Sequence, residues 1–198
     1  CQGLVSFQED VRDGAGQLMR DFEAMSIDAR ILTGDREGPA HQLADRLGLA
    51  HDRIRHGLTP EEKVAHTQEA SASGAVLFVG DGINDAPAMA AAGAGGGVGI
   101  AIDAGSNVAI EAADVIIPGD RPTAVRDLVR IGRATRRGIR QNLFLAFIYN
   151  AAAIPAAAFG LLGEHGPVVA AAAMALSDLC VVGNAVRIRL VIDRQTAS

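Results

Sequence analysis

The chain has 198 residues, a formal net charge of −5 and two cysteines, Cys1 and Cys180. An acidic balance without a basic, aromatic-interleaved surface argues against nucleic acid as a partner, and two cysteines this far apart imply no disulfide framework. Because the chain begins with Cys1 and shows no charged leader or cleavage site, we expect no signal peptide and a sequence truncated upstream.

The first 117 or so residues alternate short β-rich runs with helix-like stretches. This order is typical of an α/β fold with a parallel sheet flanked by helices. The expected elements are, in chain order, a strand at Leu4–Phe7, a helix at Val11–Met25, a strand at Ala29–Leu32, a helix at Pro39–Leu47, strands at Ala75–Val79, Val98–Ile102 and Val115–Ile117, and, between the third and fourth strands, a helix with a glycine turn within Ala88–Gly97.

One helix start is well marked. Thr59, Pro60 and Glu62 form a capping-box pattern with proline at the first helical position, which predicts a helix that carries Lys63.

From Pro122 to Arg140 the sequence is rich in arginine and predicts a basic helix. Two apolar runs follow, Leu143–Gly163 and Pro167–Val186, each about 20 residues and therefore about 30 Å long as a helix. Arginines flank both runs on the same side, which predicts a transmembrane hairpin with both chain ends in the cytoplasm and its turn at Gly163–Gly166 facing outward. The alternative is an alanine-rich helical hairpin buried in a soluble protein.

The segment that carries most chemistry reads Val-Gly-Asp-Gly-Ile-Asn-Asp-Ala-Pro from Val79 to Pro87. An apolar strand here enters a glycine-containing loop with two carboxylates, Asp81 and Asp85. Parallel sheets bind ligands at the carboxyl ends of their strands, and carboxylate oxygens suit Mg²⁺. The loop therefore predicts a magnesium site.

A second strand end gives Thr33-Gly34-Asp35, where a hydroxyl and a backbone amide could hold phosphoryl oxygens. Lys63 would add the positive charge that phosphoryl transfer needs. Taken singly, each feature has a plainer explanation: a simple turn, a solvated lysine, a helix cap. Together and in this order they predict a phosphate site.

The strings Thr33-Gly34-Asp35 and Gly80-Asp81-Gly82-Ile83-Asn84-Asp85-Ala86-Pro87 resemble two signature motifs of P-type ATPases, which belong to the haloacid dehalogenase-like superfamily. The resemblance extends from about Gly3 to Arg189, and Val108–Asp114 resembles the end of the phosphorylation domain in heavy-metal members. It implies a Rossmann-like, parallel-sheet partial domain that uses Mg²⁺ and ATP. It also implies a phosphate-handling set, Thr33, Gly34, Asp35, Lys63, Asn84 and Asp85, and a magnesium set, Asp81 and Asp85.

The resemblance also implies an organisation along the chain. Residues 1–120 would be the C-terminal part of the phosphorylation domain, 121–141 a basic juxtamembrane helix, 142–187 two transmembrane helices and 188–198 a cytoplasmic tail. The sequence contains no Asp-Lys-Thr-Gly string for the phosphorylated aspartate, no Thr-Gly-Glu and no nucleotide-binding domain. We therefore expect the chain to be inactive alone and to need the missing N-terminal part of the same pump. Smaller departures are Arg36 in place of the family's usual Asn and the glycine-rich tract Gly93–Gly97.

Polar residues within the apolar runs are the candidates for contact with a transported transition-metal cation. They are Tyr149, Asn150, Met174, Ser177, Asp178 and Cys180. A Tyr-Asn pair followed by Met-x-x-Ser resembles Cu⁺-transporting members, and thioether and thiol ligands favour Cu⁺. Asp178 stands where that group has a second Ser, so Zn²⁺ or another divalent ion stays open, and each of the other side chains could instead pack or hydrogen-bond between helices.

The leading interpretation is part of an ATP-driven heavy-metal exporter in the cell membrane, multi-pass, that works through an aspartyl phosphate. Two alternatives remain. One is a soluble haloacid dehalogenase-like phosphatase, and the other is a truncated, non-catalytic membrane protein that binds a partner or a metal.

Overall fold

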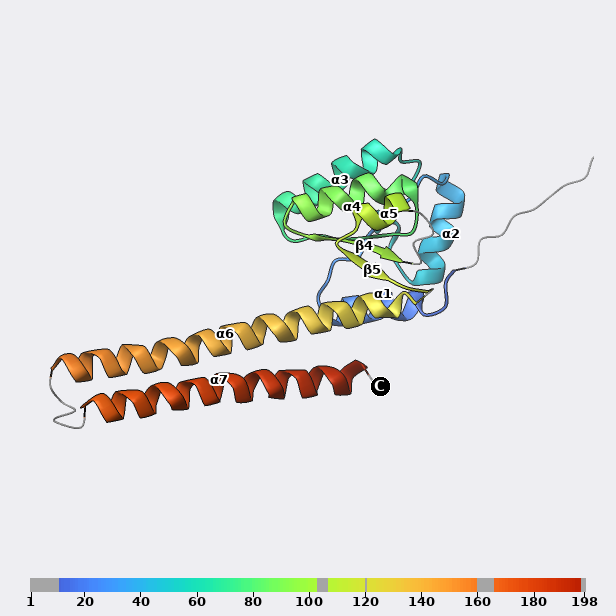
Figure 1. Ribbon diagram of the computed structural model, residues 1–198. Coiled ribbons are helices and arrows are strands. Elements are labelled where there is room, and N and C mark those ends of the chain that lie inside the picture. Colours follow the sequence, from blue (N-terminus) through green and yellow to red (C-terminus); the bar gives the residue numbers. More distant parts are fainter. Residues whose placement is uncertain (1–10, 103–106, 120, 160–165, 197–198) are drawn as a thin grey trace, which may run out of the picture. The chain divides into compact units, whose positions relative to one another are not determined.

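The computed structural model describes residues 11–102, 107–119, 121–159 and 166–196, together with most of their side chains (Figure 1). The chain divides into two compact units, Cys1–Arg126 and Asp127–Ser198. The predicted strand Leu4–Phe7 lies outside the described residues.

The first unit alternates helices and strands, and the predicted α/β class is confirmed. Every strand pair is parallel: β1 pairs with β2, and β3, β4 and β5 pair in that order. The elements are α1 (Ala15–Ala24), β1 (Ile31–Leu32), α2 (Glu37–Leu47), the short 3₁₀ turn η1 (His51–Arg53), β2 (Ile54–Arg55), α3 (Pro60–Ser73), β3 (Leu77–Gly80), the 3₁₀ turn η2 (Ile83–Asp85), α4 (Ala86–Ala94), β4 (Val98–Ile102), α5 (Asn107–Ala112) and β5 (Val115–Ile117).

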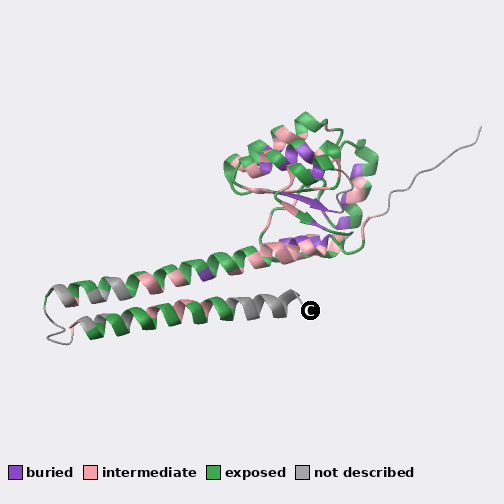
Figure 2. Ribbon diagram, in the orientation of Figure 1, coloured by how far each residue is buried: buried purple, intermediate pink, exposed green. Residues whose placement is uncertain are grey.

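Strand β4 and helix α4 form the centre of the unit. Ile100 on β4 and Met89 on α4 are fully buried, and Figure 2 shows the buried residues gathered on these elements. A Cβ at Gly99 would lie 2.6 Å from the Met89 carbonyl oxygen. Glycine at this position therefore allows the helix to approach the strand closely.

A second buried cluster lies under α2. Ala40, Ala44 and Leu47 share one face of the helix, spaced as an amphipathic helix requires, and pack with Leu49 and Ile54. This cluster places the start of α2, and with it the turn that follows β1.

Helices α1 and α2 end in the same way but with different residues. In each, a backbone amide reaches back to the carbonyl five residues earlier: Ile27 to Phe22 at 2.8 Å and Leu49 to Ala44 at 2.9 Å. The residue before that amide is in the left-handed region, with φ 71° at Gly48 and φ 55° at Ser26. Ser26 therefore adopts a conformation that glycine adopts at lower cost.

The second unit contains two long helices, α6 (Thr123–Ala158, which begins in the first unit) and α7 (Gly166–Thr196). They lie side by side, and Asn184 donates a hydrogen bond to Asn142 at 2.7 Å (Figure 1). Helix α6 contains the predicted basic segment and Pro155. Helix α7 continues through most of the expected tail, residues 188–198, because no helix-breaking residue follows Val186.

None of the helices, over the part of the chain that the structure describes, is long and apolar enough to cross a membrane. The predicted spans Leu143–Gly163 and Pro167–Val186 are therefore not confirmed. Most of the predicted turn at Gly163–Gly166 lies outside the described residues.

Candidate functional site

The turn after β1 is closed by its own side chains. The Thr33 hydroxyl donates to Asp35 Oδ2 at 2.7 Å, and the Asp35 amide donates to Thr33 Oγ1 at 3.1 Å. A Cβ at Gly34 would lie 3.2 Å from the Leu58 carbonyl oxygen, so the turn also packs tightly against the next loop. This arrangement leaves Asp35 exposed and Thr33 half-buried at the end of the strand.

That next loop is fastened to the turn by two backbone hydrogen bonds. The Gly57 amide donates to the Asp35 carbonyl at 2.7 Å, and the Leu58 amide donates to the Thr33 carbonyl at 3.0 Å. Thr59 follows at once and begins α3. The position of the Thr33 turn is thereby linked to the position of the α3 N-terminus.

Helix α3 begins with the predicted capping box, which is confirmed. The Glu62 amide donates to Thr59 Oγ1 at 3.2 Å, and the Thr59 amide donates to Glu62 Oε2 at 2.8 Å. Hydrogen bonds from its own backbone amide and from the Thr59 side chain hold the pKa of Glu61 below its ordinary value. The first turn of α3 is therefore both rigid and acidic.

One turn further on, Lys63 forms an ion pair with Asp85. The Lys63 Nζ lies 2.7 Å from Asp85 Oδ1, and the two side chains are only 14% and 19% exposed. Lys63 comes from α3 and Asp85 from η2, so the pair joins the helix to the acidic loop. This contact brings together two of the residues that the sequence predicted to act together.

The acidic loop begins at Gly80, where the backbone touches Asp85. A Cβ at Gly80 would lie 2.6 Å from the Asp85 Cβ and 2.8 Å from its Oδ2. Any other residue would push the Asp85 side chain away from its position. Glycine is thus required here by space, since no positive φ is involved.

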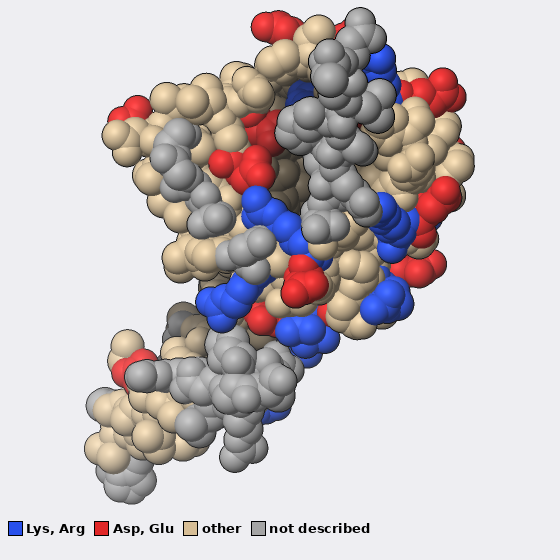
Figure 3. All heavy atoms as spheres, turned by 90° about the vertical axis from the view of Figure 1, so that its right-hand side faces the viewer, with Lys and Arg blue, Asp and Glu red and all other residues tan. Residues whose placement is uncertain are grey.

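Asp81 has a different environment from Asp85. Its Oδ2 lies 2.9 Å from Arg12 Nη2, and the two side chains are 59% and 35% exposed. Asn84 lies in η2 and is exposed. On the face shown in Figure 3, acidic and basic side chains lie next to one another.

The two carboxylates are chemically suited to Mg²⁺. Asp81 and Asp85 each have one oxygen beside a cationic side chain, which leaves each a second oxygen, and Mg²⁺ prefers such donors. Because Mg²⁺ also keeps several water or phosphate oxygens, two protein carboxylates are a fitting set. The donor chemistry therefore matches the predicted magnesium set.

The candidate transport residues lie in the second unit. Met174 and Asp178 are exposed on α7, while Ser177 and Cys180 are half-buried. Tyr149 and Asn150 lie in α6, and their side chains are outside the described residues.

The sequence analysis missed Arg12 and assigned no structural role to Asp114. The Asp114 carboxylate accepts a hydrogen bond from the Gly99 amide at 2.8 Å, and its own amide donates to the Gly99 carbonyl at 2.8 Å. No local pattern marks either residue, because each contacts a segment at least 15 residues away.

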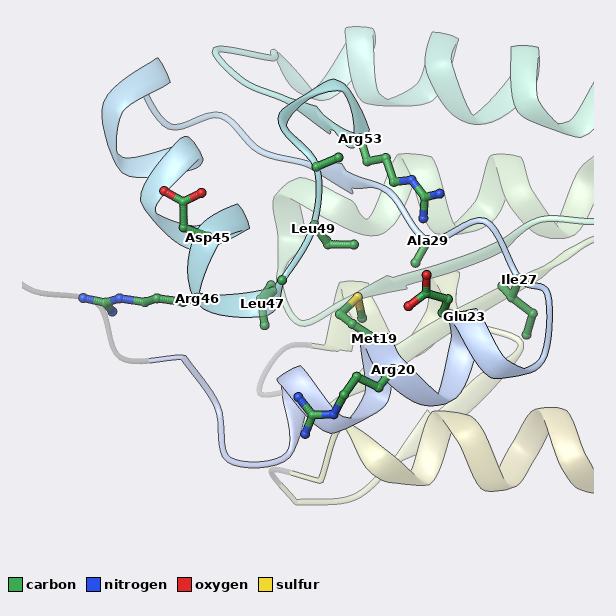
Figure 4. A pocket seen from close by; sticks show the side chains of 12 residues that line it. Met19, Arg20, Glu23, Ile27, Ala29, Asp45, Arg46, Leu47, Leu49 and Arg53 are labelled. Atoms are coloured by element: carbon green, nitrogen blue, oxygen red, sulfur yellow. The ribbon is translucent and has the colours of Figure 1, made fainter.

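A pocket of about 520 Å³ lies between α1 and the end of α2 (Figure 4). Charged side chains, including Arg20, Glu23 and Arg53, line it beside apolar ones. None of the predicted phosphate-site residues is among its lining residues.

The fold and the acidic loop define the class of this domain. Residues 2–93 match the family described as haloacid dehalogenase-like hydrolase.

The closer likeness is to metal pumps. Over 94% of its length the chain is 43% identical to the copper-exporting P-type ATPase of Staphylococcus aureus (strain JH9), and it spans 22% of that protein. It also matches two solved states of a zinc-transporting PIB-type ATPase, one with a TM-score of 0.79 and 33% identity and the other, with bound phosphate, with 0.76 and 34%. Each match covers 91% of this chain and 28% of the other. The predicted resemblance to heavy-metal-transporting P-type ATPases is confirmed.

Proposed function

We propose that this chain supplies the magnesium half-site and the last helical hairpin of an ATP-driven heavy-metal exporter. The observation that carries the proposal is the Lys63–Asp85 ion pair on an acidic loop, with the α3 helix of Lys63 fastened to the Thr33 turn. Such a cluster of one cation, a hydroxyl and carboxylates at strand ends is suited to phosphoryl transfer. The 43% identity to a copper-exporting relative supports the same conclusion.

The two short sheets indicate where the missing part would bind. Within the described residues β1 pairs only with β2, and β3 pairs only with β4 among the strands. Leu77 and Val79 on β3 are 37% and 39% exposed, which is unusual for apolar residues next to a core strand. A parallel strand from the upstream part of the pump would cover them and join β1 to β3.

That upstream strand would carry the aspartate that becomes phosphorylated. Its carboxylate oxygen attacks the γ-phosphorus of ATP, the bond to the β-phosphate oxygen breaks, and ADP leaves. Water then cleaves the acyl phosphate and releases inorganic phosphate. Lys63 offsets the charge that builds on the phosphoryl oxygens and the Thr33 hydroxyl donates to one of them, while Mg²⁺ held by Asp81 and Asp85 would neutralise further negative charge.

Helices α6 and α7 would form the membrane part with the rest of the pump. Large apolar side chains on both are exposed, among them Phe144 at 65%, Phe147 at 64% and Val168 at 70%. Apolar surface of this extent calls for a cover, and we assign lipid and neighbouring helices of the pump to it. The protein would then be a multi-pass cell-membrane protein with both chain ends cytoplasmic.

The proposed cargo is Cu⁺, with a ligand set drawn from Tyr149, Asn150, Met174, Ser177, Asp178 and Cys180. Sulfur donors support Cu⁺ over harder ions. Asp178 is the one hard donor of the set, and it makes Zn²⁺ the competing cargo.

The test restores the natural upstream sequence and measures metal-stimulated ATP hydrolysis together with acid-stable phosphoenzyme. Lys63→Ala is expected to lower turnover at least ~100-fold, because it removes a charge that stabilises the transition state. His66→Ala, one turn along the same helix, is the matched control and should leave turnover unchanged. Equal turnover in Lys63→Ala and the parent would overturn the assignment. Hydrolysis of p-nitrophenyl phosphate by the present chain alone would instead support a phosphatase.

Asp178 tests the transport assignment separately. In the restored pump, Asp178→Ala should weaken metal-stimulated turnover and metal affinity without changing phosphorylation by ATP in the absence of metal. If both metal-dependent quantities stay the same, Asp178 is not on the cation pathway. A switch from Zn²⁺ to Cu⁺ stimulation in Asp178→Ser would assign Zn²⁺ as the natural cargo.

A further inference from the structure

Three side chains with metal-binding atoms meet beside the start of α2. Glu37 and His41 lie one turn apart on the helix, and His56 follows β2. Their ligand atoms all lie within 4.8 Å of one another, with His41 half-buried and the other two exposed. The cluster is separate from Asp81 and Asp85, which lie on the loop after β3.

The imidazole of His41 is held in a fixed orientation by its neighbours. The His51 ring stacks on it with centroids 4.2 Å apart and an interplanar angle of 9°. His51 in turn is held by Asp45, whose Oδ1 lies 2.9 Å from His51 Nε2. The His56 ring meets His41 edge-on, with centroids 5.7 Å apart and an angle of 89°. Neighbouring groups that orient a histidine in this way are typical of metal sites.

We propose that Glu37, His41 and His56 bind a divalent transition-metal ion, with Zn²⁺ the best match. Two imidazoles and one carboxylate are a common zinc donor set, and a water molecule would complete the tetrahedron. Ligands at about 2.1 Å from a tetrahedral zinc ion lie about 3.4 Å apart. The three side chains must therefore close by roughly 1 Å, which the exposed Glu37 and His56 are free to do.

An ion at this position would act on the candidate phosphate site through the backbone. Glu37 lies two residues after Asp35, and His56 precedes Gly57, whose amide donates to the Asp35 carbonyl at 2.7 Å. The ion would therefore cross-link α2 to the loop that supports the Thr33 turn. Metal binding is expected to lower the mobility of that loop. This site does not depend on the proposed pump function.

The first test titrates Zn²⁺ into the full 198-residue chain in detergent and follows the imidazole C–H resonances by NMR. We expect His41 and His56 to shift and saturate together at one equivalent, while His66, on α3, stays unchanged. Shifts of all the histidines in parallel, or no shift at His41 and His56, would overturn the proposal. No substitution is needed, so the result does not depend on a variant that folds.

The second test measures Zn²⁺ affinity by calorimetry in an Asp178→Ala background, which removes a competing donor in α7. His41→Gln and His56→Gln should each weaken the site at least ~10-fold, whereas His66→Gln should have no effect. Hydrogen exchange of residues 54–59 should slow with Zn²⁺ in the parent and not in His56→Gln. Equal affinities in the parent and in the two cluster variants would refute the site.

Discussion

The Lys63–Asp85 ion pair gives the sharpest prediction about what holds the acidic loop in place. Lys63→Met keeps the length of the side chain and removes its charge. The carboxylate of Asp85 then loses the cation at 2.7 Å in a position where it is only 19% exposed. A charged group in this setting resists losing its partner, because little water can replace it.

The magnitude follows from the burial of the pair. Removing one partner of a fully buried pair costs about 3–5 kcal/mol, and the residual exposure of both side chains reduces this to about 2–3 kcal/mol. Asp85→Asn removes the charge from the other side. In a double-mutant cycle the coupling between the two substitutions is expected to be about 1–3 kcal/mol.

Hydrogen exchange of the full chain, read on peptides from α4, measures the free energy of opening next to Asp85. The Arg12–Asp81 pair provides the matched control, because its side chains are 35% and 59% exposed. Its coupling energy is expected to be about 0.2–1 kcal/mol. A Lys63–Asp85 coupling no larger than this control would refute the reasoning from burial.

Three further predictions concern single positions. Ser26→Gly should stabilise α1 by about 1 kcal/mol, since φ is 55° there; slower exchange of α1 would show it, and unchanged exchange would contradict it. Glu61 has a depressed pKa, so its contribution is present above 4.5 and lost as pH falls through the lower folded value; Glu61→Gln should lose less stability than the parent below pH 4.5 in a thermal scan, and parallel curves would rule this out. Asp114→Ala should cost about 1–3 kcal/mol by leaving the Gly99 amide unpaired, seen as faster exchange of β4, whereas Asp127→Ala on α6 should leave β4 unchanged.

Continuous apolar runs made two strands predictable. The bounds of β4 and β5 coincide with the predicted Val98–Ile102 and Val115–Ile117, because buried parallel strands are apolar on both faces. Strand β2 was missed, since its two residues, Ile54 and Arg55, carry no pattern and owe their conformation to pairing with β1. Predicted β1 and β3 differ from the observed strands by one or two residues at their ends.

The candidate site was predictable in its residue types and not in its contacts. Proximity of Lys63 and Asp85, 22 positions apart, depends on how α3 packs beside η2. The zinc cluster had a local signal that was overlooked: Glu37, His41 and Asp45 recur every four residues and so share one face of α2. His56 joins them only through the β1–β2 pairing.

The tight contact at Gly80 has a consequence for how this segment tolerates change. A residue that has no side chain determines where the Asp85 charge can lie, because any added carbon would meet the Asp85 Cβ at 2.6 Å. In a saturation screen of residues 79–87, position 80 should therefore be as intolerant as the acidic positions, and its losses should be relieved only by changes that also move residue 85. Selection on the chemistry of this loop would then be recorded partly at a position that takes no part in it.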